Sequence, residues 1–273
     1  MIVCIVKRVK KSICGVDIFM SNNIYAIFID IDGTLMERGI IPQQNIDTIA
    51  LVRKLGHKVF INTGRSYAYI PKEVFDKVQF DGVVAGIGAY VRYGDEIVRS
   101  ITIPENQLIE LADYFLSIDA PCVFEGEEKL LYLNIDSKKN DKLIVKDSSD
   151  FSSIYKGVRI SKVTIGRPLL ENEIEMLEPN FSVFQHDRYA EFALKGCSKS
   201  SGMEAMLKRI GIGRKNCIAI GDSINDVEML KYAGISVAMG NSPYEIKELC
   251  DYISETADNA GVAAALQKII LCA

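Results

Sequence analysis

The stretch FIDIDGTL, residues 28–35, places two aspartates two positions apart at the end of an apolar run. The run itself, residues 24–29 (IYAIFI), is continuously apolar, as expected of a strand buried on both faces of a parallel sheet. Residues i and i+2 of a strand point to the same side, so Asp30 and Asp32 would share a side if the strand continued. Because ligands of doubly wound sheets bind at the carboxyl ends of strands, this pair marks a candidate site.

Strands and helices alternate after this stretch. Apolar residues at helical spacing predict a helix over residues 43–55, and a second buried strand follows at 58–64. A helix over 66–78, which Pro71 either interrupts or starts, leads to a third strand at 81–86. This succession is typical of a parallel α/β fold.

The alternation stops between about residues 87 and 194 and then returns. Two expected hairpins, one around Gly94-Asp95 and one around the acidic turn at 125–128, predict an α+β segment with antiparallel strands. We interpret the acidic turn as a solvated loop. The fold class we predict is α/β, a Rossmann-like doubly wound parallel sheet core at 20–84 and 191–273 with an inserted α+β domain at 85–190.

Residues 1–19 are interpreted as a poorly specified N-terminal extension. An apolar start precedes a basic patch, which is the reverse of the order in a secretory signal peptide. Met20 opens a natural beginning for the first strand, so we expect a chain that starts at Met20 to fold and to keep its activity.

The composition is that of a globular protein with an ample core, since 48% of the 273 residues are hydrophobic and 25% are charged. A net charge of −4 argues against nucleic acid as the main partner. No apolar stretch approaches the roughly 18 residues of a membrane span, so a membrane is not expected as a partner either. Seven scattered cysteines without a C-x-x-C pair favour free thiols in a reducing cytoplasm. The oligomeric state is left open.

Polar groups also end two other buried strands, in NTGR (62–65) and GDSIND (221–226). The expected edge of the sheet would therefore carry four carboxylates, which would repel one another unless a cation lay between them: Asp30, Asp32, Asp222 and Asp226. Ligation by oxygen alone favours Mg²⁺. A hydroxyl at Thr63 and a flexible cation at Lys199 suit a phosphate beside such an ion.

The motifs DIDGT, NTGR, the lysine of KGCSKSSGM and GDSINDVEML resemble, in order, the four motifs of the haloacid dehalogenase superfamily of phosphatases. The long insert and the segment YAEFALKGCSKSSGM resemble the Cof-type sugar-phosphatase branch, which has a large α/β cap. The resemblance implies a Mg²⁺-dependent phosphatase that hydrolyses small phosphorylated metabolites, above all sugar phosphates, through an aspartyl phosphate.

The resemblance also implies a role for each motif residue. Asp30 would be the nucleophile and Asp32 the general acid and base, with Gly33 allowing a sharp turn and Thr34 positioning Asp32 or presenting its backbone. The ligands of Mg²⁺ would be the side chains of Asp30 and Asp222 and the backbone carbonyl of Asp32, and Asp226 would hold a metal-bound water or Lys199. The phosphate-binding residues would be Thr63, Gly64, Lys199 and Asn225.

Several of these residues have alternative interpretations. Asp226 and Thr63 could each cap the helix that follows them. Lys195 competes with Lys199, because both flank Gly196.

The roles of three further residues are also undecided at this point. Arg65 could reach the substrate or form a surface ion pair. His186 could face the substrate or lie in a hairpin turn. His57 follows an expected helix end, where a capping or surface role is the default.

Two functional alternatives use the same residues. A phosphomutase would return the phosphoryl group from the nucleophile to the substrate, and a non-enzymatic sensor would bind a phosphorylated metabolite without turnover. One departure concerns the substrate: where the Cof-type branch often has Asn-Gly-Ala at the entry to the cap, this chain reads GIGAY, with Ile87 in place of Asn.

Overall fold

The computed structural model describes residues 9–13, 16–20, 23–135 and 142–272. Strands β1 (Val9–Ile13) and β2 (Val16–Met20) pair in antiparallel register. Part of the expected extension at 1–19, namely residues 1–8 and 14–15, lies outside the described residues.

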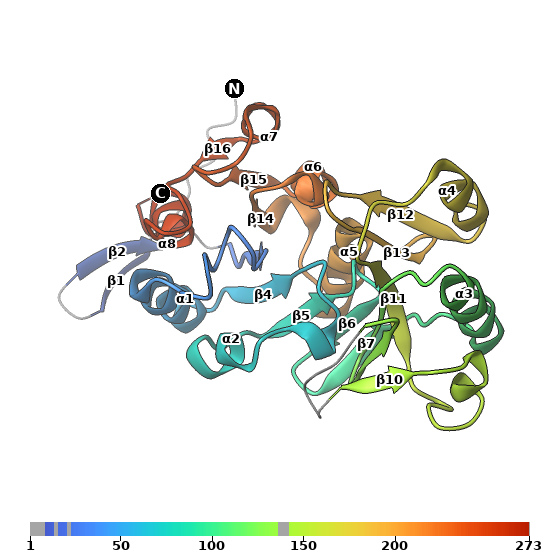
Figure 1. Cartoon of the computed structure of the whole chain (residues 1–273). Helices are drawn as coiled ribbons and strands as arrows, with labels where there is room; N and C mark the ends of the chain where they lie inside the picture. The colour runs from blue at the N-terminus through green and yellow to red at the C-terminus, as the bar shows by residue number, and fades with distance from the viewer. Residues whose placement is uncertain (1–8, 14–15, 21–22, 136–141, 273) are drawn as a thin grey trace. The chain divides into compact units, whose positions relative to one another are not determined.

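The chain divides into two compact units (Figure 1). The first takes the described residues within Met1–Asn62, Lys72–Gly82 and Leu207–Ala273. The second takes those within Thr63–Pro71 and Val83–Met206. The loop that follows the second buried strand therefore groups with the inserted residues.

The first unit is built on parallel strands. Their order is β16 (Tyr252–Ile253), β15 (Ile235–Ala238), β14 (Cys217–Gly221), β3 (Ala26–Ile29) and β4 (Lys58–Asn62). Ile29 lies opposite both Ile220 and Ile61, so β14, β3 and β4 end nearly level with one another. The residues that follow these three strands therefore lie at the same edge of the sheet.

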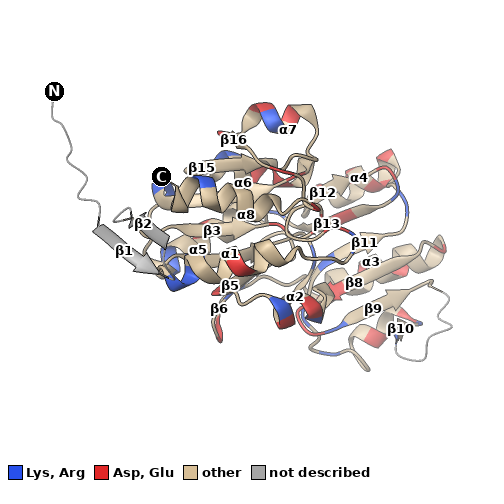
Figure 2. Cartoon of the chain, turned by 90° about the vertical axis from the view of Figure 1, so that its left-hand side faces the viewer, with Lys and Arg blue, Asp and Glu red and all other residues tan. Residues whose placement is uncertain are grey.

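Helices connect the strands of the first unit. They are α1 (Gln43–Lys54), α2 (Lys72–Lys77), α6 (Val227–Tyr232), α7 (Tyr244–Leu249) and α8 (Gly261–Leu266), with short turns η3 (Arg214–Asn216), η4 (Ile224–Asp226) and the π-helical η5 (Gln267–Leu271). Helix α2 begins directly after Pro71, so the proline starts the helix rather than interrupting it. Both α2 and α7 carry charges of both signs (Figure 2).

The second unit contains a six-stranded sheet. Its order is β10 (Leu143–Val145), β9 (Leu130–Leu133), β8 (Cys122–Gly126), β11 (Ile160–Ile165), β13 (Ala190–Leu194) and β12 (Phe181–Gln185). All neighbours are antiparallel except β10 and β9. Strand β5 (Gly82–Ala85) lies beside the hairpin of β6 (Tyr90–Tyr93) and β7 (Glu96–Ser100).

One face of this six-stranded sheet is covered by helices. Helices α3 (Glu105–Ser117) and α4 (Glu171–Leu177) lie on the same side of β11–β13 (Figure 1), and the turn η2 (Ser148–Phe151) joins their core. Phe115 of α3 stacks on Phe192 of β13 at 6.4 Å between ring centroids. Because strand side chains alternate, Val163 and Ile165 of β11 enter this core while Lys162 points to the other face. Two connecting elements, η1 (Tyr67–Tyr69) and α5 (Lys199–Ile210), complete the fold.

Two local expectations were wrong. The acidic turn is solvated only at Glu128, because Glu125 belongs to β8 and Glu125 and Glu127 are only 2% and 3% exposed. His57 is buried rather than at the surface, and its Nδ1 accepts a hydrogen bond from the Tyr25 amide at 3.1 Å. In both cases a buried polar side chain bonds to a residue that is distant in the sequence. Among the described residues, no helix is long and apolar enough to cross a membrane.

Candidate active site

Asp30 is the first residue beyond β3. Its amide donates to the carbonyl of Ile220 at 3.1 Å, and its carbonyl accepts from the Leu35 amide at 3.2 Å, so the backbone is fixed on both sides. The side chain is buried, whereas that of Asp32, two residues further on, is exposed. The strand does not continue past Asp30, and the two carboxylates therefore have different environments rather than sharing one side.

Three carboxylates form one group at the strand ends of the first unit. Each of Asp30, Asp222 and Asp226 offers an oxygen, and these oxygens all lie within 4.8 Å of one another. Such a set of hard oxygen donors fits a divalent cation of the Mg²⁺ or Ca²⁺ type, and a cation offsets the repulsion of like charges.

Asp226 also orders the turn that carries the fourth motif. Its Oδ2 accepts hydrogen bonds from the amides of Asp222 at 3.0 Å and Ser223 at 3.1 Å. Ser223 and Asp226 complete a capping box at η4. Asp226 is also the N-cap residue of α6, but its side chain makes no capping hydrogen bond to that helix, so it orders the preceding turn instead. The same carboxylate belongs to the acidic group.

Gly33 and Thr34 shape the approach to Asp222. Gly33 has a φ of +73°, and a Cβ at this position would lie 2.4 Å from Asp222 Oδ2. The hydroxyl of Thr34 donates to Asp222 Oδ1 at 3.0 Å. The sharp turn expected at Gly33 is present, and the Thr34 hydroxyl has Asp222 as its acceptor.

Asn241 is a contributor that the sequence analysis missed. Its Nδ2 donates to the Gly33 carbonyl at 2.9 Å, while its Oδ1 accepts from the Ala257 amide at 2.9 Å. Asn241 follows β15 in the run AMGNS, so it shares the pattern of a polar residue just beyond an apolar parallel strand. That pattern could have identified it.

The two residues of the second motif that are expected to bind phosphate, Thr63 and Gly64, lie in the second unit. Thr63 is buried, and its Oγ1 accepts a hydrogen bond from the Arg65 amide at 3.1 Å. Ser66, not Thr63, is the N-cap residue of η1, so the capping alternative for Thr63 was wrong. The carbonyl of Gly64 accepts a hydrogen bond from Lys162 Nζ at 3.1 Å.

The two competing lysines differ in burial. Lys199 opens α5 and is 2% exposed, whereas Lys195 is exposed. The buried position is the one that would strengthen the interaction of an ammonium with an anion, because the local dielectric is lower. In the first unit, Asn225 Oδ1 accepts from the Ser223 hydroxyl at 2.8 Å.

Arg65 and His186, the two other candidates for substrate contacts, have local partners. Arg65 lies over the ring of Tyr69 at 5.1 Å and donates to the Tyr69 carbonyl at 3.2 Å. His186 lies in the turn between β12 and β13, its ring stacks on Tyr189 at 4.1 Å, and its Nε2 is 3.4 Å from Glu191 Oε1. The hairpin-turn interpretation of His186 is thus correct.

Ile87 occupies an unusual backbone position. Its φ is +55°, between Gly86 at +58° and Gly88 at +82°. Asn adopts this left-handed region far more readily than a β-branched residue. The Asn expected at this point of the chain would suit the backbone, whereas Ile87 instead packs its side chain into an apolar cluster with Ala89, Ala193 and Cys197.

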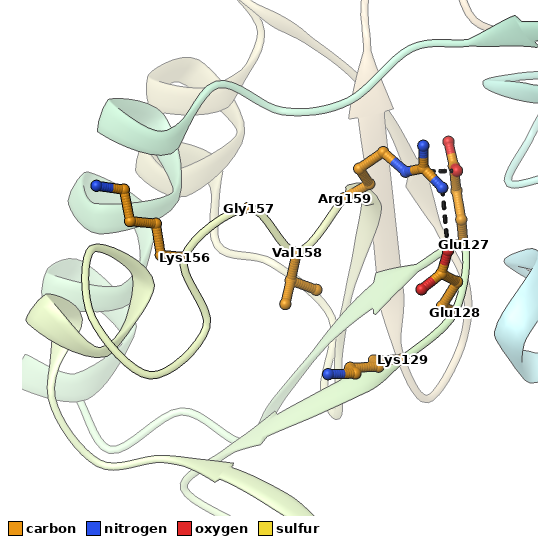
Figure 3. Close-up of a pocket in the computed structure, with 7 residues that line it drawn as sticks. All are labelled: Glu127, Glu128, Lys129, Lys156, Gly157, Val158 and Arg159. Atoms are coloured by element: carbon orange, nitrogen blue, oxygen red, sulfur yellow. Dashed lines mark hydrogen bonds and ion pairs between the residues drawn. The ribbon is translucent and has the colours of Figure 1, made fainter.

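The second unit also contains a pocket of about 400 Å³ (Figure 3). Arg159 reaches from one wall to the carboxylates of Glu127 at 2.8 Å and Glu128 at 3.1 Å. Three of the side chains drawn around this pocket, those of Arg159, Glu127 and Glu128, are thus joined by ion pairs (Figure 3).

Comparison with known proteins assigns the family. A profile of the haloacid dehalogenase-like hydrolases matches residues 27–266. The 5-amino-6-(5-phospho-D-ribitylamino)uracil phosphatase YitU of Bacillus subtilis is 26% identical over 271 residues, which cover 91% of this chain and 98% of that protein. Phosphoglycolate phosphatase 1 of Saccharolobus solfataricus is 25% identical over 248 residues, which cover 89% and 95%. The structure of the subclass IIB sugar phosphatase BT4131 superposes with a TM-score of 0.77 at 27% identity, covering 89% of this chain and 98% of that one.

The chain therefore belongs to the haloacid dehalogenase-like hydrolases, and the resemblance to the Cof-type branch is confirmed. The predicted α/β class, with a parallel core and an inserted domain, is confirmed as well. The protein is a phosphatase of this family.

Proposed function

We propose that this phosphatase depends on Mg²⁺ and hydrolyses small phosphorylated metabolites, sugar phosphates in particular, through an aspartyl phosphate on Asp30. The observation that carries the proposal is the buried carboxylate of Asp30, which directly follows β3 and lies in one group of oxygens with Asp222 and Asp226. Three carboxylates this close stay ionised together only when a positive charge offsets their repulsion.

The side chains of Asp30 and Asp222 and the backbone carbonyl of Asp32 would hold Mg²⁺, with Asp226 fixing the amide of Asp222. When bound, the ion would supply positive charge for the nucleophile and for the phosphoryl oxygens. The hydroxyl of Thr34 already fixes one oxygen of Asp222, which orients the other.

In the first half-reaction, Asp30 attacks phosphorus, the bond from phosphorus to the leaving oxygen breaks, and Asp32 gives its proton to that oxygen. In the second, Asp32 accepts a proton from water as the water attacks the phosphorus of the aspartyl phosphate. Inorganic phosphate leaves, and both carboxylates return to their initial state. The exposure of Asp32 suits this exchange, since the residue must reach an alcohol in one step and water in the next.

Thr63, Gly64, Lys199 and Asn225 would bind the phosphoryl oxygens, with Arg65 and His186 as weaker candidates for contacts to the rest of the substrate. Support for Thr63 comes from its hydroxyl, which accepts from the Arg65 amide and so has its proton available for an anion. The inserted residues 85–190 would act as the cap domain that selects the leaving group.

The substrate class is supported by the relatives. The names of the three similar proteins describe phosphatases of a sugar phosphate, a phosphoribityl compound and phosphoglycolate, all of them small phosphate monoesters. A reducing cytoplasm is supported by the free thiols of Cys122, Cys197, Cys217, Cys250 and Cys272.

A panel of small phosphate esters tests the proposal. Each ester is incubated with the protein and Mg²⁺, and free inorganic phosphate is measured, because release of phosphate separates a hydrolase from a mutase. We expect turnover of sugar phosphates and of p-nitrophenyl phosphate, with loss of turnover in EDTA. A protein that binds the esters without releasing phosphate would be a sensor.

A further inference from the structure

Three charged side chains lie buried on the face of the second unit's sheet opposite its helical core. Glu125 of β8, Lys162 of β11 and Glu191 of β13 are 2%, 3% and 5% exposed. Burying ionised groups costs free energy, and well-packed apolar side chains of similar size often serve stability equally well. A buried charge cluster therefore calls for a role beyond holding the strands together.

Ion pairs join the cluster. Lys162 Nζ forms an ion pair with Glu191 Oε2 and lies 3.6 Å from Glu125 Oε1. Burial alone would lower the pKa of Lys162, but the two carboxylates more than offset this and raise it. Burial would likewise raise the pKa of Glu191, yet Lys162 and His186 bring it down to about 2.

The same side chains hold the loop that follows β4. Besides its two carboxylate partners, Lys162 Nζ donates to the carbonyl of Gly64 at 3.1 Å. Glu125 Oε2 accepts a hydrogen bond from the Ser66 amide at 3.3 Å, while its Oε1 accepts from the Thr164 hydroxyl at 2.5 Å. One cation and one anion of the sheet therefore fix backbone groups two residues apart in this loop.

Other backbone groups of this loop bond to β5 and the turn after it: the Thr63 amide donates to the Val84 carbonyl at 2.9 Å, and the Arg65 carbonyl accepts from the Gly86 amide at 2.7 Å. Residues 63–66 lie in neither a helix nor a strand, so their backbone groups need partners from elsewhere. The Gly64 carbonyl would otherwise lack its charged donor, and the Ser66 amide its charged acceptor. Hydrogen bonds to charged groups are among the stronger ones in proteins.

We propose that Lys162 and Glu125 are positioning residues of the phosphatase, which hold residues 63–66 in the conformation that presents Thr63 and the neighbouring amides to a phosphoryl group. This inference rests on the proposed function, in which this loop binds phosphate. Glu191 keeps the lysine charged and directs its ammonium toward Gly64.

The chain offers a matched control. Arg167, whose side chain is 33% exposed, forms an ion pair in the same unit with the buried Glu173 at 2.6 Å and also donates to the Pro168 carbonyl. Arg167→Met therefore removes the ion pair of a buried carboxylate without removing a contact of residues 63–66. Any effect common to Lys162→Met and Arg167→Met reflects lost stability alone.

The test compares the full-length wild type, Lys162→Met and Arg167→Met. Hydrogen exchange measures protection of the peptide that covers 62–71, and titration with inorganic phosphate in the presence of Mg²⁺ measures phosphate affinity. For Lys162→Met we expect exchange at Arg65 and Ser66 to accelerate, and phosphate affinity to fall, by about tenfold each. Arg167→Met should match the wild type in both.

Wild-type values for Lys162→Met, or equal changes in both variants, would overturn the proposal. If Lys162→Met does not fold, the double variant Lys162→Met/Glu191→Gln removes the charges of the pair together and takes its place, with the same expected and overturning results. A wild type that binds phosphate but hydrolyses no ester would refute the proposed function, while the loop measurements would still decide the role of Lys162.

Discussion

The hydroxyl of Thr34 donates a hydrogen bond to Asp222 Oδ1 across 3.0 Å, although 188 positions separate the two residues in the sequence. The bond joins the turn after β3 to the turn after β14, and these strands are neighbours in the parallel sheet. A residue of the first motif thereby orients a carboxylate of the last one.

Thr34→Val should weaken Mg²⁺ binding by about tenfold, because an outer-sphere hydrogen bond that orients a metal ligand contributes that much to affinity. Calorimetric titration with Mg²⁺ measures the change. Thr34→Ser keeps the hydroxyl and serves as the control, with an affinity near that of the wild type. Equal affinities for the Val and Ser variants would contradict the assigned role.

Gly33→Ala should reduce both stability and Mg²⁺ binding. A non-glycine residue at a φ of +73° costs about 1–2 kcal/mol, and the new Cβ would displace the carboxylate of Asp222, which lies 2.4 Å from that position. Denaturant unfolding and Mg²⁺ titration measure the two effects. Gly39→Ala is the matched control: Gly39 has a φ of +79° with no atom near the added methyl, so only the stability loss should appear.

Asp30→Asn should lower turnover of p-nitrophenyl phosphate by at least about 10³-fold, because an amide cannot attack phosphorus as a carboxylate does. Asp32→Asn should slow both half-reactions by roughly 10²–10⁴-fold and allow phosphoenzyme to accumulate. Released phosphate and the mass of the intact protein after substrate addition report the two outcomes. Activity of Asp30→Asn near the wild-type level would eliminate the covalent mechanism.

His57 should make stability depend on pH near neutrality. Burial lowers the pKa of His57 in the folded protein below its ordinary value of 6.5, so the unfolded chain binds the proton more readily. The contribution of neutral His57 to the free energy of unfolding is complete above pH 6.5. It decreases as the pH falls from 6.5 toward the lower pKa of His57 in the folded protein. Urea unfolding at a series of pH values measures the slope, and His57→Gln should reduce it. An unchanged slope in this variant would assign the dependence to other groups.

The parallel core could be predicted because its signals are local. Continuous apolar runs such as 24–29 and 217–220 allow little besides a buried strand, and the polar residues just beyond them mark the edge where Asp30 and Asp222 lie. Family motifs supplied the chemical roles. That Asp30 is buried and Asp32 exposed could not be predicted, because it depends on the exact residue at which β3 ends. The sequence does not specify this end to one residue.

The buried charges of the second unit could not be predicted. Glu125, Lys162 and Glu191 belong to three strands, and each alone has the sequence context of a solvated residue. The run Glu125-Gly126-Glu127-Glu128 even has the composition of an exposed turn. The pairing of β8, β11 and β13 brings these charges together. Each charged side chain can then be buried because the others are its partners.

The order of strands in the first unit has a consequence for the growing polypeptide. Strand β3 lies between β4, which follows it closely in sequence, and β14, which is synthesised after the whole insertion. A nascent chain that has not yet extended beyond residue 221 leaves one edge of β3 unpaired and lacks two of the three carboxylates of the acidic group. On the ribosome the inserted residues are complete before this sheet can close, so the acidic group is assembled only once translation has passed Asp226.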